Sequence, residues 1–248
     1  MLMIAAIIQA RMGSTRLPGK ILKTVEGVPL LKYQIDRVGK SRLINKIIVA
    51  TSTSEEDDVV EKFCTENDIE CFRGSEHDCL DRYYHCAIKC HADIIVRLTS
   101  DCPLSDPQII DCTINLYLAT GVDYAANTIP PETSTYPDGC DVEVFSMESL
   151  ARAFLEVQDP HDREHVTFFF WKYQQGFKTA QLKYGKDYSR YRFTVDYPED
   201  FTVVEYIFKE LKKRKKIGHL EELIEIIDSS PEMKSKNAHY YAGIGWRK

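Results

Sequence analysis

No stretch of this 248-residue sequence approaches the roughly 20 consecutive apolar residues that a membrane-spanning helix requires. The chain also lacks an excess of positive charge, because 38 acidic residues outnumber 32 basic ones and the net charge is −6. General binding to nucleic acid is therefore not expected. The apolar start, residues 1–8, has no basic segment and no small-residue cleavage site, so we interpret it as a strand rather than a signal peptide.

Cysteine pairs with metal-binding spacing are also missing. The eight cysteines include no Cys-x-x-Cys pair, and without a secretion signal they predict free thiols in a reducing cytoplasm. The segment from His161 to His165 fits the H-x-x-E-H pattern of some zinc proteases, but the sequence offers no evident third ligand. We therefore do not expect a zinc site there.

The most informative segment that is present is QARMGSTRLPGK, residues 9–20, which contains no acidic residue. It follows the apolar run Met3–Ile8, which predicts a buried strand, so it lies where open α/β sheets bind their ligands. Gly13 and Gly19 allow the backbone to approach a ligand closely. The cations of the segment are Arg11, Arg16 and Lys20. Such a set of donors suits a polyphosphate.

The spacing excludes the common phosphate-binding loops. Five residues instead of four separate the two glycines, and Ile21 stands where a Walker loop has a hydroxyl residue. The three closely spaced glycines of a dinucleotide fingerprint are absent as well. A plain basic surface loop is the alternative, but glycines and cations coinciding at a strand end favour phosphate binding.

Short apolar runs alternate with longer amphipathic segments along the chain. The expected strands are Met3–Ile8, Lys46–Ala50, Glu70–Arg73, Asp93–Leu98, Cys140–Phe145, Lys178–Leu182 and Tyr191–Val195. The expected helices are Glu55–Asn67, Asp78–His91, Pro107–Thr120, Met147–Val157, Asp162–Gln175 and Pro198–Lys216. The β-α-β order of the first half predicts a parallel sheet with helices on both faces. Without a linker or repeat, we expect a single domain over residues 1–248, with a C-terminal helical elaboration from about residue 198.

Two aspartates follow predicted strands. Asp101 comes after Asp93–Leu98, and Asp196 comes after Tyr191–Val195, directly before a helix that begins near Pro198. A carboxylate beside a phosphate site repels the ligand unless a cation lies between them, and Mg²⁺ is the natural mediator. Taken alone, each residue is also compatible with a turn or a helix cap.

The chain resembles the nucleotide-sugar cytidylyltransferases. The closest match is the spore coat polysaccharide branch, and the acylneuraminate and Kdo cytidylyltransferases are more distant relatives. The resemblance covers about residues 4–205. The matching segments are residues 9–20, 50–52 (ATS), 72–75 (FRGS), 80–84 (LDRYY), 101–103 (DCP), 136–145 (YPDGCDVEVF), 163–167 (REHVT) and 196–200 (DYPED).

This resemblance implies a three-layer α/β nucleotide-diphospho-sugar transferase fold, which is Rossmann-like with a mostly parallel mixed sheet. It implies a Mg²⁺-dependent enzyme that uses CTP to activate a sugar acid, a sugar phosphate or a related glycan precursor and releases pyrophosphate. It also implies a homodimer that pairs through segments such as Cys140–Phe145 and the aromatic run Val166–Trp171.

The candidate site residues fall into groups. The expected catalytic residues are Arg11, Lys20, Asp101 and Asp196, of which the two aspartates would hold the metal. The expected nucleotide-binding residues are Ala10, Arg11, Gly13, Ser14, Arg16, Lys20, Thr51, Arg82 and Ser100. The expected substrate-binding residues are Asp141, Glu143, Glu164 and His165.

Some of these assignments have structural alternatives. Arg82 is equally compatible with a salt bridge to Asp78 or Asp81, and Asp141 and Glu143 with an exposed sheet edge.

The sequence departs from the relatives at two places. Gln9 stands where the Kdo and sialic acid enzymes have proline, and Thr99-Ser100 stands where Kdo enzymes have Gln-Gly. The base and the acceptor therefore cannot be transferred from them. Alternative functions are a glycosyltransferase, for which Asp141-Val-Glu143 is a weak D-x-D motif, a guanylyltransferase acting on a sugar phosphate, and a nucleotide-binding regulator.

Overall fold

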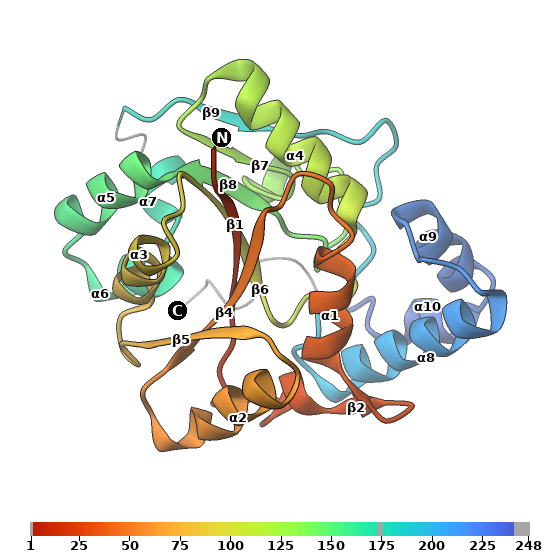
Figure 1. Ribbon diagram of the computed structural model, residues 1–248. Helices are drawn as coiled ribbons and strands as arrows, with labels where there is room; N and C mark the ends of the chain where they lie inside the picture. Colours follow the sequence, from red (N-terminus) through yellow and green to blue (C-terminus); the bar gives the residue numbers. More distant parts are fainter. Residues whose placement is uncertain (1, 173–175, 241–248) are drawn as a thin grey trace.

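A computed structural model describes residues 2–172 and 176–240 (Figure 1). A seven-stranded sheet with the order β5-β4-β1-β6-β8-β7-β9 forms its centre. These strands are β1 (Ile4–Gln9), β4 (Lys46–Ser52), β5 (Glu70–Gly74), β6 (Ile94–Thr99), β7 (Tyr124–Ala126), β8 (Glu143–Ser146) and β9 (Thr179–Gln181). Only β8 runs antiparallel to its neighbours, so the sheet is mixed but mostly parallel. This architecture confirms the predicted fold class.

Helices cover both faces of the sheet (Figure 1). Even-numbered side chains of β1, such as Ile8, pack with α1 (Leu30–Val38), α2 (Asp58–Glu66), α4 (Pro107–Thr120), α8 (Pro198–Arg214) and α9 (Leu220–Asp228). Odd-numbered ones, such as Ile7, pack with α3 (Cys79–Lys89), α5 (Met147–Glu156) and α7 (Phe168–Trp171). Because strand side chains alternate between faces, β1 contributes to both apolar cores of a three-layer structure.

The remaining elements are short. They are β2 (Thr24–Val25), β3 (Val28–Pro29), α6 (Pro160–His165), α10 (Pro231–Lys236) and the 3₁₀ turns η1 (Lys20–Leu22), η2 (Glu55–Asp57) and η3 (Pro131–Thr133). No helix in the described ranges is both long and apolar enough to cross a membrane.

The sheet topology determines where a ligand can bind. From β1 the chain builds the sheet outward through β4 and β5, and then returns to the other side of β1 with β6. The carboxyl ends of β1 and β6 therefore form a topological switch point, which is where open α/β sheets bind ligands. Residues 10–20, here called the β1 loop, leave β1 at this point.

Helix α4 has the predicted boundaries because its end signals are strong. The Asp106 side chain accepts a hydrogen bond from the backbone N–H of Gln108, and Pro107 occupies the first turn. Gly121 ends the helix with a left-handed φ of 62°.

The predicted strand Tyr191–Val195 is wrong as a strand. The segment is extended, but it joins the fold through one isolated bridge between Asp138 and Arg192. Its backbone N–H groups bond to single carbonyls of two loops, with Phe193 donating to Asp138 and Val195 to Asp101. Buried Tyr191, Phe193 and Val195 explain the apolar alternation, which reports burial and not strand pairing.

Two other predicted elements differ from the structure. The expected helix Asp162–Gln175 is broken at Val166, whose φ of 61° is not helical, and residues 173–175 lie outside the described ranges. The expected strand Cys140–Phe145 begins only at Glu143, and it lies inside the sheet rather than at an edge.

Candidate active site

The β1 loop crosses the carboxyl end of the sheet and is held from both sides. The Asp57 carboxylate accepts hydrogen bonds from the backbone N–H of Met12, at 2.7 Å, and from the hydroxyl of Ser52. At the far end of the loop, Gly19 has a left-handed φ of 66° and precedes the turn that begins at Lys20. The Asp57 contacts therefore fix the loop to β4, and the turn at Gly19 brings Lys20 back to the edge of the sheet.

Beneath the β1 loop lies a cavity of about 620 Å³. Its lining includes nearly all the predicted site residues: Ala10, Arg11, Gly13, Ser14, Arg16, Lys20, Arg82, Ser100, Asp101, Asp141, Glu143, Glu164, His165 and Asp196. The exception is Thr51, which is fully buried in β4 and does not line the cavity. Residues from the first 20 and from beyond position 190 thus share one cavity.

Lys20 joins the two predicted metal-binding aspartates. Its Nζ lies 2.8 Å from Asp196 Oδ1 and 3.5 Å from Asp101 Oδ2. Burial alone would lower the pKa of Lys20, but the two carboxylates outweigh it and raise that pKa. Burial would likewise raise the pKa of Asp101, but Lys20 and hydrogen bonds from Thr99 and Cys102 lower it. Lys20 and Asp101 therefore each favour the charged form of the other.

The other two cations of the β1 loop are more open to solvent. Arg16 pairs with Asp196 at 3.0 Å, and Arg11 lies 3.8 Å from Glu164. Their side chains are 36% and 38% exposed, against 12% for Lys20. Lys20 is thus the enclosed charge of the loop, and the two arginines are its solvent-facing charges.

Arg192 is an important residue that the sequence reasoning missed. Its guanidinium forms ion pairs with Asp138, Asp196 and Asp200, and its side chain is only 4% exposed. Burial alone would lower the pKa of Arg192, but the three carboxylates raise it. The available signal was the polar face of the alternating segment 191–195, on which Arg192 and Thr194 stand among buried apolar residues.

A second missed residue, Arg97, lies in the β6 strand. It forms a buried ion pair with Glu143 on the adjacent strand β8 and donates a hydrogen bond of 3.1 Å to Gln9. The Tyr124 hydroxyl donates to the other Glu143 oxygen at 2.6 Å. Glu143 therefore lines the cavity with both oxygens already engaged, and the alternative of an exposed sheet edge is wrong.

Asp141 has a different environment. Its carboxylate accepts hydrogen bonds from the Thr128 hydroxyl at 2.6 Å and from the Gly139 backbone at 2.8 Å. Burial raises the pKa of Asp141 against these two hydrogen bonds, and the nearby acids Asp101 and Glu143 add to the rise. Among the six carboxylates of the cavity, it is the one for which no ion pair occurs within the described residues.

Arg82 lies on the cavity wall and is fully buried. Its guanidinium donates to the Ser75 carbonyl and to the Cys79 sulfur, whereas Nε has no partner in the described structure. The structure shows no ion pair of Arg82 with either Asp78 or Asp81 among the described residues; Asp78 instead pairs with Arg163 at 2.6 Å. A buried guanidinium without a carboxylate favours an anionic or carbonyl-bearing ligand.

The histidine motif does not form a metal centre. No group of three potential metal ligands is assembled anywhere in residues 2–172 and 176–240. The His165 ring stacks on Phe168 at 4.3 Å and approaches His161 at 4.7 Å. Burial, followed by the nearby His161 and Arg97, lowers the pKa of His165 to about 4, so its ring is neutral at pH 7.

Comparison with known proteins agrees with this geometry. A family model described as cytidylyltransferase matches residues 5–243. The spore coat polysaccharide biosynthesis protein SpsF of Bacillus subtilis is 31% identical over 240 residues, which cover 92% of this chain and 95% of that protein.

Solved structures lead to the same family. A cytidylyltransferase from Leptospira borgpetersenii serovar Hardjo-bovis has a TM-score of 0.86 at 31% identity, covering 94% of this chain and 97% of that one. A CMP-2-keto-3-deoxy-manno-octonic acid synthetase complexed with CTP shares the fold, with a TM-score of 0.61 at 17% identity over 84% of this chain and 99% of that one. The predicted resemblance is confirmed: this chain belongs to the cytidylyltransferase family and is a nucleotidyltransferase.

Proposed function

We propose that the protein transfers the cytidylyl group of CTP to an oxygen of a sugar-like acceptor. The acceptor oxygen forms a bond to the α-phosphorus, the bond from that phosphorus to the β-phosphate oxygen breaks, and pyrophosphate leaves. The observation that carries the proposal is the convergence of the β1-loop cations on Asp101 and Asp196 at the switch point. Phosphoryl transfer depends mainly on alignment and charge neutralisation, which this arrangement supplies.

The β1 loop would bind the triphosphate. Arg11 and Arg16 are positioned to contact phosphate oxygens from the open side of the cavity, and Lys20 from its enclosed side. Within the same proposal Ala10, Gly13, Ser14 and Ser100 contribute small side chains and backbone groups beside the nucleotide. The buried Arg82 would meet the base or a phosphate, whereas Thr51 would act only through the packing of β4.

The residues present fit a magnesium ion. Asp101 and Asp196 lie close enough together to share one cation, because both contact the Lys20 ammonium. Mg²⁺ typically takes one or two protein carboxylates and completes its shell with phosphate and water. These two aspartates would hold it, and the bound ion would neutralise and orient the phosphate oxygens. Lys20 would then stabilise the charge that develops at the α-phosphate.

The acceptor would occupy the β8 side of the cavity. There Asp141 carries no ion pair among the described residues, so we expect it to accept a hydrogen bond from a hydroxyl or amino group of the acceptor. Glu143 would act indirectly, by holding Arg97. Glu164 and His165 line the same side, where the neutral His165 ring can exchange hydrogen bonds with a sugar.

The contacts that Glu143 already makes favour cytidylyl transfer over glycosyl transfer. A glycosyltransferase would need Asp141-Val-Glu143 as a metal-binding motif, but Arg97 and Tyr124 already engage both Glu143 oxygens. The acceptor class remains that expected from the sequence, namely a sugar acid, a sugar phosphate or a related glycan precursor. A guanylyltransferase is distinguished only by the nucleotide it accepts.

A pyrophosphate-release screen tests the proposal. Four nucleoside triphosphates would be crossed with nonulosonates, sugar phosphates and amino sugars in the presence of Mg²⁺. We expect release with CTP and one acceptor class. Tight CTP binding without release on any acceptor would instead indicate a regulator, and sugar transfer from a nucleotide sugar without pyrophosphate would indicate a glycosyltransferase.

We also propose a homodimer that works in the cytoplasm. All eight cysteines are free thiols, which suits a reducing compartment. The two segments expected to pair, however, lie inside the chain: β8 is an interior strand, and Phe168, Phe169 and Phe170 are buried. The homodimer proposal therefore depends on family resemblance, and the interface between the two subunits would have to use other residues than these two segments. Light scattering at micromolar concentration should give twice the chain mass, and a monomer would refute it.

A further inference from the structure

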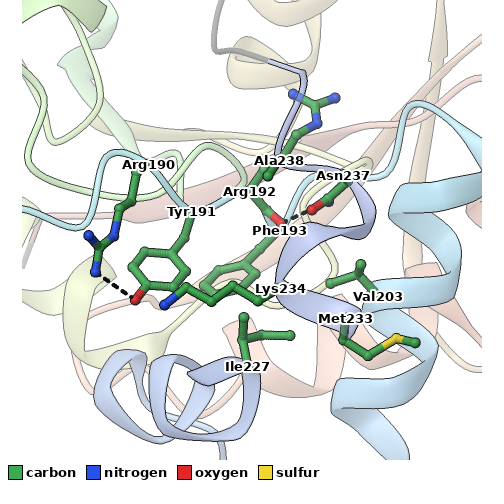
Figure 2. Close-up of a pocket in the computed structure, with 10 residues that line it drawn as sticks. All are labelled: Arg190, Tyr191, Arg192, Phe193, Val203, Ile227, Met233, Lys234, Asn237 and Ala238. Atoms are coloured by element: carbon green, nitrogen blue, oxygen red, sulfur yellow. Dashed lines mark hydrogen bonds between the residues drawn. The ribbon is translucent and has the colours of Figure 1, made fainter. Parts of the chain in front are cut away.

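The C-terminal end of the described chain reaches the candidate active site. After α10, Asn237 is only 5% exposed, and its side chain turns toward the segment that carries Arg192 (Figure 2). Asn237 Nδ2 donates one hydrogen bond to the Arg192 carbonyl, at 3.2 Å, and another to Asp200 Oδ1, at 2.8 Å. One amide group thus links the C-terminal segment to two residues next to the cavity.

Asp200 is the centre of this link. It is fully buried and accepts five hydrogen bonds, of which one comes from Asn237. Two come from the Arg192 guanidinium, and two from the backbone N–H groups of Asp196 and Tyr197, each at 3.0 Å. Asp200 therefore fixes both the backbone of Asp196 and the arginine whose Nη2 lies 3.1 Å from the Asp196 carboxylate.

The packing around Asn237 is incomplete on one side. A separate cavity of about 210 Å³ adjoins both Asn237 and Arg192, between α10 and residues 190–193 (Figure 2). Because side chains do not fill this side, the amide hydrogen bonds are what position the Asn237 side chain there.

A second contact runs from the same segment to the β1 loop. The Tyr240 ring stacks on Tyr197 with centroids 4.0 Å apart and an angle of 4° between planes. The Arg16 guanidinium lies 5.0 Å from the Tyr197 centroid and donates to its hydroxyl at 3.4 Å. Tyr240 therefore supports the ring that orients Arg16.

We propose that Asn237 and Tyr240 are positioning residues for the nucleotidyl transfer reaction. Asn237 acts through Asp200 and Arg192 on the Asp196 carboxylate, and Tyr240 acts through Tyr197 on Arg16. The C-terminal segment therefore helps to set the geometry of the active site, in addition to packing on the core. The inference rests on the proposed function, because it assigns Asp196 to the metal and Arg16 to the nucleotide.

The first test uses Asn237→Leu, which keeps a branched side chain of similar size and loses both amide donors without adding a charge beside Asp200. The control is Met233→Ala on α10, which removes packing from a half-buried residue and no hydrogen bond to Arg192 or Asp200. Both variants are compared in kcat, in Mn²⁺ binding by equilibrium dialysis, and in thermal unfolding, at a temperature where both are folded.

We expect Asn237→Leu to lower kcat by about tenfold or more and to weaken Mn²⁺ binding severalfold. Met233→Ala should keep kcat and Mn²⁺ binding within about twofold of wild type at a similar loss of thermal stability. Activity losses that merely follow the loss of stability in both variants, or an Asn237→Leu enzyme with normal kcat, would overturn the role of Asn237.

The second test compares Tyr240→Phe with Tyr240→Ala. Phenylalanine keeps the stack on Tyr197, so its KM for CTP should stay near wild type, whereas alanine should raise that KM by about fivefold. Equal KM values in the two variants would overturn the role of Tyr240. If the wild-type enzyme released no pyrophosphate on any substrate, the proposed function would fail, and Mn²⁺ and CTP binding by the same variants would still decide the inference.

Discussion

Lys20 differs from the other cations of the β1 loop in its surroundings. Its ammonium contacts Asp101 and Asp196 and is largely enclosed, whereas Arg11 and Arg16 face solvent. A charge in an enclosed, preorganised site stabilises a transition state more than an exposed charge does. The three residues should therefore divide between binding and catalysis.

We predict that Lys20→Ala lowers kcat by about 10²-fold or more, because the lysine meets charge that grows in the transition state. Arg11→Ala and Arg16→Ala should mainly raise the KM for CTP. Steady-state pyrophosphate release measures both parameters. Arg42→Ala removes an exposed cation outside the cavity and should change neither, and equal small effects at all three loop positions would contradict the assignment.

His165 makes stability depend on pH. Its pKa of about 4 in the folded chain lies below the ordinary value of about 6.5 expected in the unfolded chain. Between these values the unfolded chain binds the proton more readily, so protonation favours unfolding. The contribution is complete above about pH 6.5 and is lost as the pH falls toward 4.

We predict that the wild-type melting temperature falls more between pH 7.5 and pH 5 than that of His165→Gln. Differential scanning fluorimetry across this range measures the difference. His77→Gln is the control, because it replaces an imidazole that is 91% exposed and outside the cavity. A parallel pH dependence in wild type and His165→Gln would show that the buried ring is not the cause.

At the scale of elements, one glycine determines how the extended segment 190–195 meets the loop before β8. Gly139 has a left-handed φ of 98°. A Cβ added there would lie 2.1 Å from the Thr194 nitrogen and 2.4 Å from the Phe193 carbonyl carbon. Both atoms are backbone, so the clash cannot be relieved by a side-chain rotation, and the segment that carries Arg192 would have to move.

We predict that Gly139→Ala destabilises the protein by about 2 kcal/mol or more and lowers kcat, because it combines overpacking with a strained φ. Gly27→Ala is the matched control, with a left-handed φ of 81° but open space around the new methyl group. It should cost about 1–2 kcal/mol and leave kcat unchanged. Urea unfolding and pyrophosphate release distinguish the two, and indistinguishable variants would contradict the packing argument.

The elements that sequence predicted well are those with strong local signals. The apolar runs of β1, β4 and β6 and the end signals of α4 determine these elements locally. The extended segment 191–195 was misassigned because alternation of apolar residues does not reveal backbone partners. The break at Val166 was missed because no glycine or proline marks it between the charged helix Pro160–His165 and the apolar helix Phe168–Trp171.

At the scale of the whole molecule, the candidate site could be predicted only where function leaves a local pattern. Glycines and cations at a strand end marked the β1 loop, and aspartates after apolar runs marked Asp101 and Asp196. Arg97 has no such mark, because its partner Glu143 lies 46 residues away along the chain, and the sequence does not show that Arg192 joins Asp196 to Asp138, 54 residues from Arg192. Long-range ion pairs of this kind become visible only once the fold brings the segments together.

The pairing of Asp101 with Asp196 depends on the complete fold. The two residues come from segments almost 100 residues apart, and their carboxylates meet at the Lys20 ammonium. Two neighbouring carboxylates repel each other unless a cation joins them. If both hold the same metal ion, loss of either one disrupts the site. We predict that Asp101→Asn and Asp196→Asn each abolish most turnover, and that the double variant is little worse than either, because the residues act as a unit. Near-ultraviolet circular dichroism should show the native fold in all three. The metal-free enzyme should be inactive and recover with Mg²⁺ or Mn²⁺, so turnover that survives chelation, or a near-normal kcat in either single variant, would show that the two carboxylates do not form the metal site.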